Sequence, residues 1–310
     1  MKIAIIIPYF GQFPVWFDLY LYSCSKNPQV DFLFFTDCVL PKRIYDNTIF
    51  YKTDFKSYCK RVSDCLAIDF RPTNAYKLCD LKPFYGVIHK EELKDYDFWG
   101  FGDCDLVYGD LQILISKENL ERYEFITTHS GRVAGHFTVM RKDSKYTLAC
   151  LSIPEYKNKL QEKNHLGIDE SDFSNIIFPE LKNRWRFYIR IVKPLKIISE
   201  NRYFDYIERI FFKRKSRLLF KECYTTIIPT EKDLWLYDLE TGTLRRDSNT
   251  SHKLPYLHYL FFKKNCYEQT KFSWGDKFYD VPQDIFVKNT SSKVIGISAK
   301  GINVLNRNQL

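Results

Sequence analysis

Residues 3–11 read IAIIIPYFG, a continuous apolar run that ends at a proline and a glycine. An unbroken apolar run is typical of a strand that is buried on both faces of a parallel sheet. Residues 13–25 favour a helix, and a second buried run, DFLFF, follows at 31–35. The order strand, helix, strand predicts an α/β domain whose ligand binds at the carboxyl ends of its strands.

The same pattern continues to about residue 180, so we expect a mixed sheet flanked by helices over residues 1–180. The sequence predicts helices at 54–69, 76–94, 111–123, 144–163 and 169–183, and strands at 97–102, 125–128 and 136–140. We expect a basic, aromatic and helical insertion at 181–250. The last segment, 251–310, is expected to return to the active site, with this C-terminal part helical or irregular.

Charge and aromatic content point to an anionic partner. The 310 residues carry a net charge of +9, and 17% of them are aromatic. Residues 182–221 hold 13 Lys and Arg against three acidic residues, with aromatic residues interleaved. This segment fits a solvated basic face, a surface that docks on anionic lipid, or a nucleic-acid contact.

The cysteines favour a reducing compartment. Their number is nine, and no two of them form a CxxC pair, so a zinc site with paired spacing is not expected. The apolar start is too short for a membrane span and has no cleavage site of small residues. We therefore expect a cytoplasmic protein, with peripheral contact at the inner face of the membrane through 182–221.

The stretch with the clearest chemistry is 97–110, DFWGFGDCDLVYGD, in which an aromatic strand runs into Asp103 and Asp105. Side chains at i and i+2 of an extended segment point the same way, so both carboxylates can face one point past the strand end. Two hard oxygen ligands suit Mg²⁺ or Mn²⁺, which would bridge a diphosphate. The alternative is a solvated turn with side-chain to backbone bonds.

These residues carry a family resemblance. The opening strand, residues 75–86 (AYKLCDLKPFYG) and the DxD at 103–105 resemble the GT-A class of nucleotide-sugar glycosyltransferases. They look more closely like a group of bacterial proteins associated with capsule or surface-polysaccharide synthesis. The resemblance covers 1–180 well and 181–310 poorly. It implies a GT-A-like (Rossmann-like) fold, a Mn²⁺ or Mg²⁺ ion, and transfer from a nucleotide-sugar donor, with a UDP-sugar favoured, to a glycan or lipid-linked acceptor.

The resemblance also implies which residues bind the donor. The first strand and its loop contact the nucleoside, the end of the second strand meets base or ribose, and Lys77 lies near the phosphates unless it is a surface lysine. The donor-binding residues implied are Pro8, Tyr9, Phe10, Gly11, Thr36, Asp37, Lys77, Asp80, Asp103, His136 and Lys263.

A second match, 168–177 (IDESDFSNII), resembles the Asp-Gln-Asp-x-x-Asn element of some retaining GT-A families, but the Gln is missing. Glu170 could instead be the general base that an inverting enzyme needs. Asp169 and Asp172 are the competing candidates for that catalytic role. The alternative is an acidic first turn of a helix, stabilised by the helix dipole.

A third match is 257–264, LHYLFFKK, which resembles a C-terminal histidine segment that completes the metal site in some GT-A families. It implies His258 as the third metal ligand, with His252 as the rival, and Lys263 or Lys264 as the phosphate clamp. The loop 128–137 contributes His129, Arg132 and His136 as sugar or acceptor contacts by analogy, or it is a plain turn. Two tryptophans fit either a sugar platform or the core: Trp235 and Trp274.

Two other function classes compete. A sugar nucleotidyltransferase usually carries a glycine-rich basic first loop, whereas PYFGQF at 8–13 has one glycine and no Lys or Arg. A non-catalytic glycan- or nucleic-acid-binding module would use the basic segment 182–221 and would not need Asp103 and Asp105. The transferase interpretation requires no nucleic acid. The chain contains neither a P-loop nor a GxGxxG or GxSxG motif.

Overall fold

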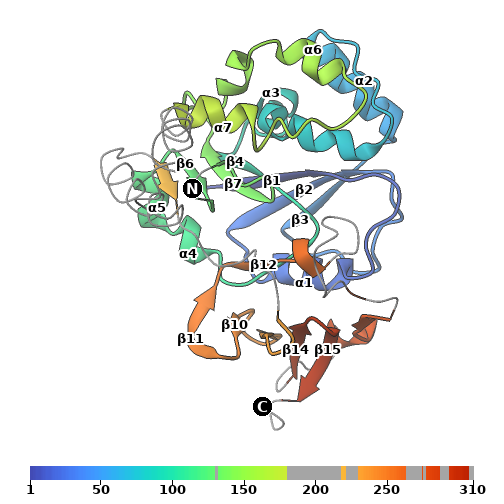
Figure 1. The fold of residues 1–310 in the computed structure, drawn as a ribbon, viewed down its shortest axis with the longest axis vertical. Coiled ribbons are helices and arrows are strands. Elements are labelled where there is room, and N and C mark those ends of the chain that lie inside the picture. Colours follow the sequence, from blue (N-terminus) through green and yellow to red (C-terminus); the bar gives the residue numbers. More distant parts are fainter. Residues whose placement is uncertain are drawn as a thin grey trace, which may run out of the picture.

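The computed structural model describes residues 1–129, 132–179, 218–220, 230–262, 274, 277–286 and 293–306. A central sheet of seven described strands has the order β3-β2-β1-β4-β7-β6-β8 (Figure 1). These strands are β1 (Ile3–Pro8), β2 (Val30–Thr36), β3 (Thr48–Lys52), β4 (Phe98–Gly102), β6 (Phe125–Thr127), β7 (Phe137–Arg141) and β8 (Leu218–Phe220). The prediction of an α/β fold with a mixed sheet flanked by helices is confirmed.

The direction of the strands identifies one point on the sheet edge. Strand β1 pairs in parallel with β2 on one side and with β4 on the other, and β2 pairs in parallel with β3. Strand β7 runs antiparallel to both β4 and β6. The chain therefore moves outward from β1 to β3 and then returns to the other side of β1. Ligands of open α/β sheets bind outside the carboxyl ends of the strands at such a reversal.

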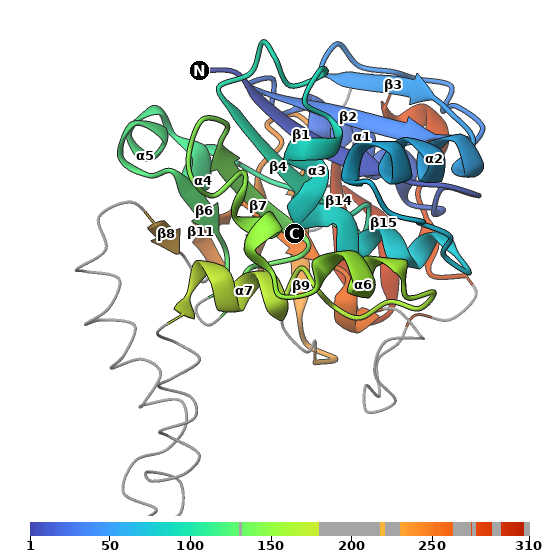
Figure 2. The ribbon, with the colours of Figure 1, turned by 90° about the horizontal axis from the view of Figure 1, so that it is seen from above.

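Strand β1 is apolar throughout because both faces of the sheet are covered (Figures 1 and 2). Ile5 and Ile7 pack with the helices of one face, and Ala4 and Ile6 pack with those of the other. The first face carries α1 (Phe17–Ser25), α4 (Gln112–Ile115) and α5 (Lys117–Arg122). The second carries α2 (Phe55–Leu66), α3 (Tyr85–Ile88), α6 (Tyr156–Gln161), α7 (Asp172–Ile177) and the 3-10 helices η1 (Ala75–Phe84) and η2 (Ala149–Ser152).

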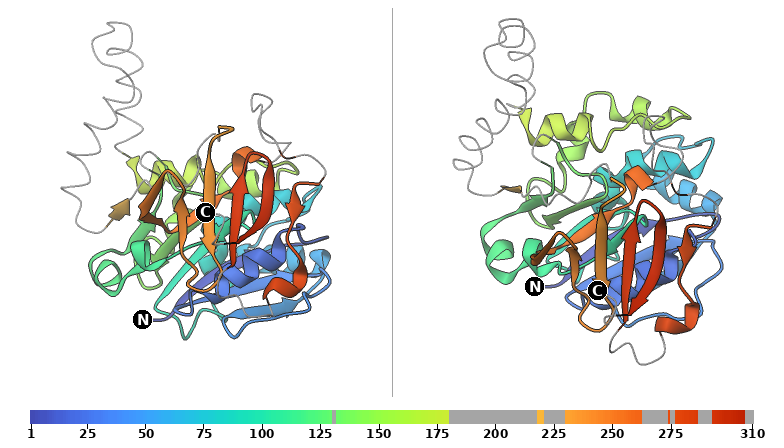
Figure 3. Two further views of the ribbon diagram at one scale, coloured as in Figure 1. Left: turned by 90° about the horizontal axis from the view of Figure 1, so that it is seen from below. Right: turned by 60° about the horizontal axis from the view of Figure 1, so that its bottom comes forward.

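A second sheet covers the outer side of α1 (Figure 3). Its six described strands have the order β11-β10-β9-β14-β15-β13. Leu19 and Tyr22 of α1 pack into the core of this sheet, whereas Phe17 and Tyr20 pack on the central sheet. The elements here are β9 (Leu234–Asp238), β10 (Leu244–Arg246), β11 (Asn249–Leu254), β13 (Tyr279–Asp280), β14 (Lys293–Ser298), β15 (Gly301–Asn306) and the 3-10 helices η4 (Leu260–Phe262) and η5 (Gln283–Phe286).

The second sheet corrects the expectation of a helical or irregular C-terminal part. Trp235, Leu236 and Tyr237 of β9 are buried, and so are residues 294–297 of β14. A short buried run cannot be assigned to a strand or a helix from periodicity alone, and each of these strands is only five or six residues long. The helical insertion expected at 181–250 is wrong for its described residues, which include β8, β9, β10 and the start of β11. Residues 181–217 and 221–229 lie outside the described part of the chain, so a helical structure and a contact with lipid stay predictions for them.

Several predicted helices are shorter than expected because local signals divide them. The helix expected at 111–123 is two helices, α4 and α5, and the Ser116 hydroxyl caps the second by accepting the Asn119 N–H at 3.2 Å. The segment expected as a helix at 76–94 begins as a 3-10 helix that contains Pro83, and it is α-helical only over α3. Proline lacks the N–H that an α-helix needs as a donor, which accounts for the departure from α-helical geometry.

A short ladder connects the two sheets. Strand β5 (Leu106–Tyr108) pairs antiparallel with β12 (Tyr256–His258), and Gly109 donates its N–H to the Pro255 carbonyl at 2.9 Å. A Cβ atom at residue 109 would lie 2.2 Å from the Leu254 carbonyl oxygen and 2.7 Å from Leu244 Cβ. The glycine is therefore required for the close approach of β10 and of the end of β11, which leads into β12.

We expect Gly109→Ala to lower the free energy of unfolding by about 1–3 kcal/mol, the usual cost of overpacking a filled interior. Urea unfolding followed by circular dichroism measures this loss. Hydrogen exchange should show faster exchange at the amides that join β5 and β12. An unchanged midpoint with unchanged exchange would contradict the packing described for this ladder.

Candidate functional site

The turn from Asp103 to Asp105 links β4 to β5 at the carboxyl edge of the central sheet. Two distant segments fix its backbone. The Trp16 indole Nε1 donates to the Cys104 carbonyl at 2.8 Å, and the Tyr259 N–H donates to the Asp105 carbonyl at 2.8 Å. The turn therefore lies at the end of β4, next to β1, where the strand order reverses. The loop before α1 and the residue after β12 hold it in place.

His258 lies at the end of β12, where the ladder places it opposite Leu106. Its Nε2 is 3.4 Å from Asp105 Oδ2. One ligand atom each from Asp103, Asp105 and His258 lies within 4.8 Å of the other two. Two carboxylates and an imidazole can hold a divalent cation, and the imidazole favours Mn²⁺ over the oxygen-preferring Mg²⁺. The rival, His252, is exposed on β11 and is not part of this group.

Lys82, near the end of η1, is a buried cation that sequence reasoning missed. Its Nζ lies 2.6 Å from Asp103 Oδ1 and 3.7 Å from Asp169 Oδ2. Burial disfavours the charged amine, but the carboxylates of Asp103 and Asp169 together raise the pKa of Lys82 well above its usual value. Its one signal in the sequence is its place directly before Pro83, where the chain leaves ordinary helical geometry.

His136 is buried directly against the predicted metal ligand. Its ring stacks on that of His258 with centroids 4.3 Å apart, and its Nε2 is hydrogen-bonded to the Tyr256 hydroxyl at 2.9 Å. Its backbone carbonyl accepts the Asp103 N–H at 3.2 Å. Burial lowers the pKa of His136 well below its usual value, and the neighbouring His258 lowers it further. His136 therefore supports both the DxD turn and His258 as a neutral imidazole.

Asp169 lies across Lys82 from the DxD turn. Its side chain is only 6% exposed, and burial raises its pKa to about 7, although Lys82 opposes that rise. A carboxylate that titrates near neutral pH is suited to accept a proton from a reacting hydroxyl. Of the three acidic residues predicted for this role, Asp169 is the one that pairs with the same lysine, Lys82, as Asp103 does.

The other two acidic candidates are paired elsewhere. Glu170 Oε2 lies 2.8 Å from Arg132, and its Oε1 accepts the Gly135 N–H at 3.3 Å. Asp172 begins α7 and lies 2.9 Å from Lys159 of α6. An acidic first turn with a basic neighbour matches the alternative structural interpretation of this segment.

Gly135 allows the backbone to approach both carboxylates. A Cβ atom there would lie 2.6 Å from Asp169 Oδ2 and 3.2 Å from Glu170 Oε1. Both atoms lie at the ends of flexible side chains, which can move without a shift of the backbone. The fold therefore tolerates the change, but the positions of these two carboxylates do not stay the same. We expect Gly135→Ala to change the free energy of unfolding by less than about 1 kcal/mol. It should nevertheless move the titration of Asp169, read from its carboxyl ¹³C shift by NMR. An unmoved titration would contradict this contact.

Asp80 and Lys77 form a buried clamp. Asp80 accepts the Leu166 N–H at 2.8 Å and the Ile168 N–H at 2.9 Å, and Lys77 Nζ lies 2.9 Å from its Oδ2. Both side chains are fully buried, so the interpretation of Lys77 as a surface lysine is wrong. The donor contacts implied for these two residues stay predictions. What the structure shows is that they fix the loop that delivers Asp169.

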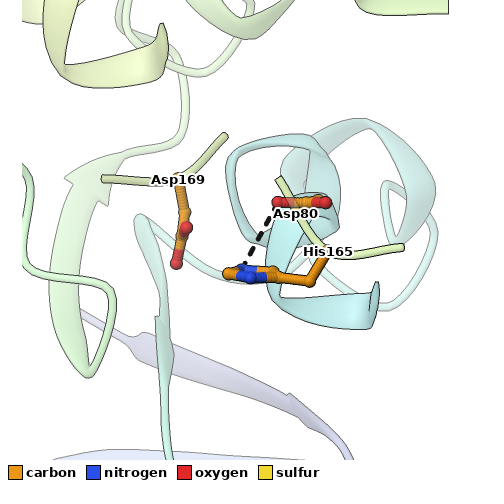
Figure 4. A group of neighbouring side chains, drawn as sticks. All are labelled: Asp80, His165 and Asp169. Carbon is orange, nitrogen blue, oxygen red and sulfur yellow. Dashed lines mark ion pairs between the residues drawn. The ribbon is translucent and has the colours of Figure 1, made fainter. Parts of the chain in front are cut away.

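Asp80, His165 and Asp169 form a second group of possible metal ligands (Figure 4). His165 Nε2 lies 3.5 Å from Asp80 Oδ1, and the Asp169 carboxylate lies next to this pair. Each Asp80 oxygen already accepts a backbone N–H, and Oδ2 also pairs with the Lys77 ammonium. Asp103 also pairs with a lysine, but through Oδ1 alone. The Asp103 group is therefore the stronger cation site.

The loop after β1 contains two aromatic residues with different surroundings. Tyr9, next to the strand end at Pro8, stacks on Phe13 with ring centroids 5.4 Å apart. Phe10 packs against Phe55 of α2 at 5.3 Å. Of these two aromatic residues, both predicted to contact the nucleoside, Phe10 thus contributes to the core.

The loops after β1 and β2 are joined by one bond. The Gly11 N–H donates to Asp37 Oδ1 at 2.7 Å, and Gly11 has a φ of +97°, which favours glycine. Thr36 is buried, and its hydroxyl accepts the Cys38 N–H at 3.0 Å. Asp37 itself is exposed at the edge of the sheet.

Two further predictions concern the C-terminal part. Trp235 and Trp274 are both buried, and the Trp274 indole donates to the Ser298 carbonyl at 2.9 Å, so both belong to the core rather than to a sugar platform. Lys263 and Lys264, the predicted phosphate clamp, lie outside the described residues.

No helix in the described part of the chain is both long and apolar enough to cross a membrane.

Comparison with known proteins gives a family but no activity. No curated protein sequence matches the chain. A family of unknown function, DUF6625, matches residues 5–289, which include the DxD turn, the Asp169 loop and His258. The chain therefore belongs to the DUF6625 family.

Proposed function

We propose that this protein is a metal-dependent glycosyltransferase of the GT-A type. It would move a sugar from a nucleoside diphosphate donor to a hydroxyl of a glycan or a lipid-linked glycan in surface-polysaccharide synthesis. The observation that carries the proposal is the grouping of Asp103, Asp105 and His258 beside the β1–β4 reversal. This candidate cation site thus lies at the sheet edge where α/β folds bind nucleotides, which supports the proposal.

The side chains fit a nucleotide diphosphate in charge as well as place. Asp103, Asp105 and His258 would hold Mn²⁺, with Mg²⁺ as the alternative. When bound, the ion supplies positive charge against the diphosphate as it leaves. Lys82 adds a fixed positive charge next to Asp103 and keeps that carboxylate in one position.

The loops after β1 and β2 would hold the nucleoside. Tyr9 offers a ring that can stack on a base, and Asp37 offers a carboxylate that can accept from ribose hydroxyls. The bond from Gly11 to Asp37 keeps the two loops at a fixed separation. This preorganisation lowers the entropic cost of binding the donor.

In the transfer step, the acceptor hydroxyl oxygen forms a bond with the anomeric carbon of the donor sugar. The bond from that carbon to the diphosphate oxygen breaks, and its electron pair leaves with the nucleoside diphosphate. Asp169 accepts the hydroxyl proton, because its carboxylate is available at and above neutral pH and lies across Lys82 from the DxD turn.

Calorimetric titration with UDP, GDP, CDP and dTDP and with the corresponding triphosphates, each with and without Mn²⁺, tests this proposal. We expect one diphosphate, with UDP favoured, to bind only when Mn²⁺ is present. A sugar nucleotidyltransferase would instead bind the nucleoside triphosphate better than the diphosphate. A purely glycan-binding module would bind no nucleotide under any metal condition, and that result would overturn the proposal.

A further inference from the structure

Two loops beside Asp169 are fastened to each other. The Thr73 N–H and hydroxyl both donate to the Lys163 carbonyl, at 3.3 and 3.0 Å. The Asn74 side chain accepts the Tyr76 N–H at 3.0 Å and so fixes the start of η1. Together with the Asp80 clamp, these bonds give the loops at 73–76 and 163–168 a defined relative position.

An aromatic pair stands on these loops. Tyr76 is 63% exposed, and its ring centroid lies 4.7 Å from that of His165 at an angle of 59°. His165 is 28% exposed, and its Nε2 faces Asp80 at 3.5 Å. An exposed tyrosine alone is ordinary. Here, however, the ring is oriented by an imidazole whose ring nitrogen lies within 4.8 Å of an Asp169 carboxylate oxygen.

A chain of contacting side chains leads from the surface to the predicted metal site. Tyr76 contacts His165, His165 lies next to Asp169 (Figure 4), and Lys82 joins Asp169 to Asp103. A molecule lying on the aromatic pair would therefore have its edge near the Asp169 carboxylate.

The chemistry of this surface fits a pyranose ring. A pyranose offers an apolar C–H face, which packs on an aromatic ring, and hydroxyls at its edge, which need donors and acceptors. Burial lowers the pKa of His165, so its imidazole is neutral at pH 7. The Asp80 carboxylate favours the proton on Nε2, and Nδ1 can then accept a bond from a hydroxyl.

We propose that Tyr76 and His165 form a subsite that holds a pyranose ring of the acceptor with one hydroxyl directed at Asp169. This inference rests on the glycosyltransferase function proposed above and names the acceptor class for that site.

Saturation-transfer NMR on the full chain tests the subsite directly. The probes are the methyl glycosides of glucose, galactose, N-acetylglucosamine and rhamnose, each measured with and without UDP and Mn²⁺. We expect transfer to the ring protons of at least one probe. Tyr76→Ala and His165→Ala should each weaken its binding at least tenfold, whereas Tyr76→Phe should keep it. Tyr51→Ala is the control, because Tyr51 is a partly exposed tyrosine stacked on Phe35 of the central sheet.

The outcomes separate this inference from the proposed function. If no probe shows transfer, or if Tyr76→Ala binds as wild type does, the subsite is overturned, even where UDP binding with Mn²⁺ is intact. If a probe binds through Tyr76 and His165 while no nucleotide binds, the pyranose subsite is supported and the transferase proposal fails. Equal weakening by Tyr51→Ala would show a general loss of structure and would also overturn the subsite.

Discussion

Asp105→Asn should weaken the binding of UDP in the presence of Mn²⁺ by at least about 100-fold, because loss of a residue that merely supports a metal ligand already costs 10–100-fold. The amide keeps the shape of the side chain but removes the negative charge beside His258. Calorimetric titration with Mn²⁺, and again after chelation with EDTA, measures the effect. Binding of UDP by the variant in EDTA should equal that of the wild type.

Asp110→Asn is the matched control in the same acidic stretch. The Asp110 carboxylate accepts the Gln112 N–H at 3.0 Å just before α4, and the amide oxygen of Asn can accept the same bond. We expect UDP affinity within about twofold of wild type, since a surface change that keeps this bond has little effect. Equal losses in the two variants would mean that the stretch acts only through its total charge.

The second large effect is expected from Asp169→Asn. Removing a general base costs about 10²–10⁴-fold in rate. The rate of UDP release from the donor sugar in the presence of acceptor measures this loss. In the wild type, the rate should rise with pH through an apparent pKa near 7, since the carboxylate must be ionised to accept the proton.

The same substitution should stabilise the fold above neutral pH. Burial raises the pKa of Asp169 from 3.8 to about 7, so the folded chain holds this proton more tightly than the unfolded chain does. The proton's contribution to the free energy of unfolding is complete below about pH 4 and is lost as pH rises through 7. Above pH 7 the ionised carboxylate lowers the free energy of unfolding by on the order of 4 kcal/mol at most. Asp169→Asn should therefore unfold at higher urea than wild type at pH 8, with a smaller difference at pH 5.

Asp172→Asn serves as the control for Asp169→Asn. Asp172 belongs to the same acidic segment, but it pairs with Lys159 at the start of α7. We expect nearly unchanged transfer and a slight loss of stability. A large loss of transfer in Asp172→Asn, with Asp169→Asn active, would reverse the assignment of the base.

The strands that position the site could be predicted because their sequence patterns are local. The apolar run at 3–8 and the aromatic strand before Asp103 each predict a buried strand without knowledge of the rest of the chain. The parallel pairing of β1 with β2 follows from the helix α1 between them. The grouping of Asp103 with Asp105 follows from the extended backbone between them.

The partners of the DxD turn depend on long-range pairing. His258 reaches Asp105 only because β12 pairs with β5 across some 150 residues. Gly109 must be small because β10 and the end of β11, which leads into β12, lie against it. Lys82 reaches Asp103 because Pro83 keeps this stretch from forming an ordinary helix. Neither geometry is encoded in a periodic pattern. His258 is implied only by the family resemblance, and that resemblance names Lys77 as the lysine near the phosphates, whereas Lys82 is missed. The second sheet was missed because its strands are short and separated by turns.

The central claim, that Asp103, Asp105 and His258 share one cation, is tested most directly by electron spin-echo envelope modulation of Mn²⁺ bound to the protein. Wild type should show ¹⁴N modulation from a coordinated imidazole. His258→Gln should remove this modulation, and His252→Gln should keep it, since His252 is exposed on β11. Absence of ¹⁴N modulation in the wild type, or its persistence in His258→Gln, would contradict the account.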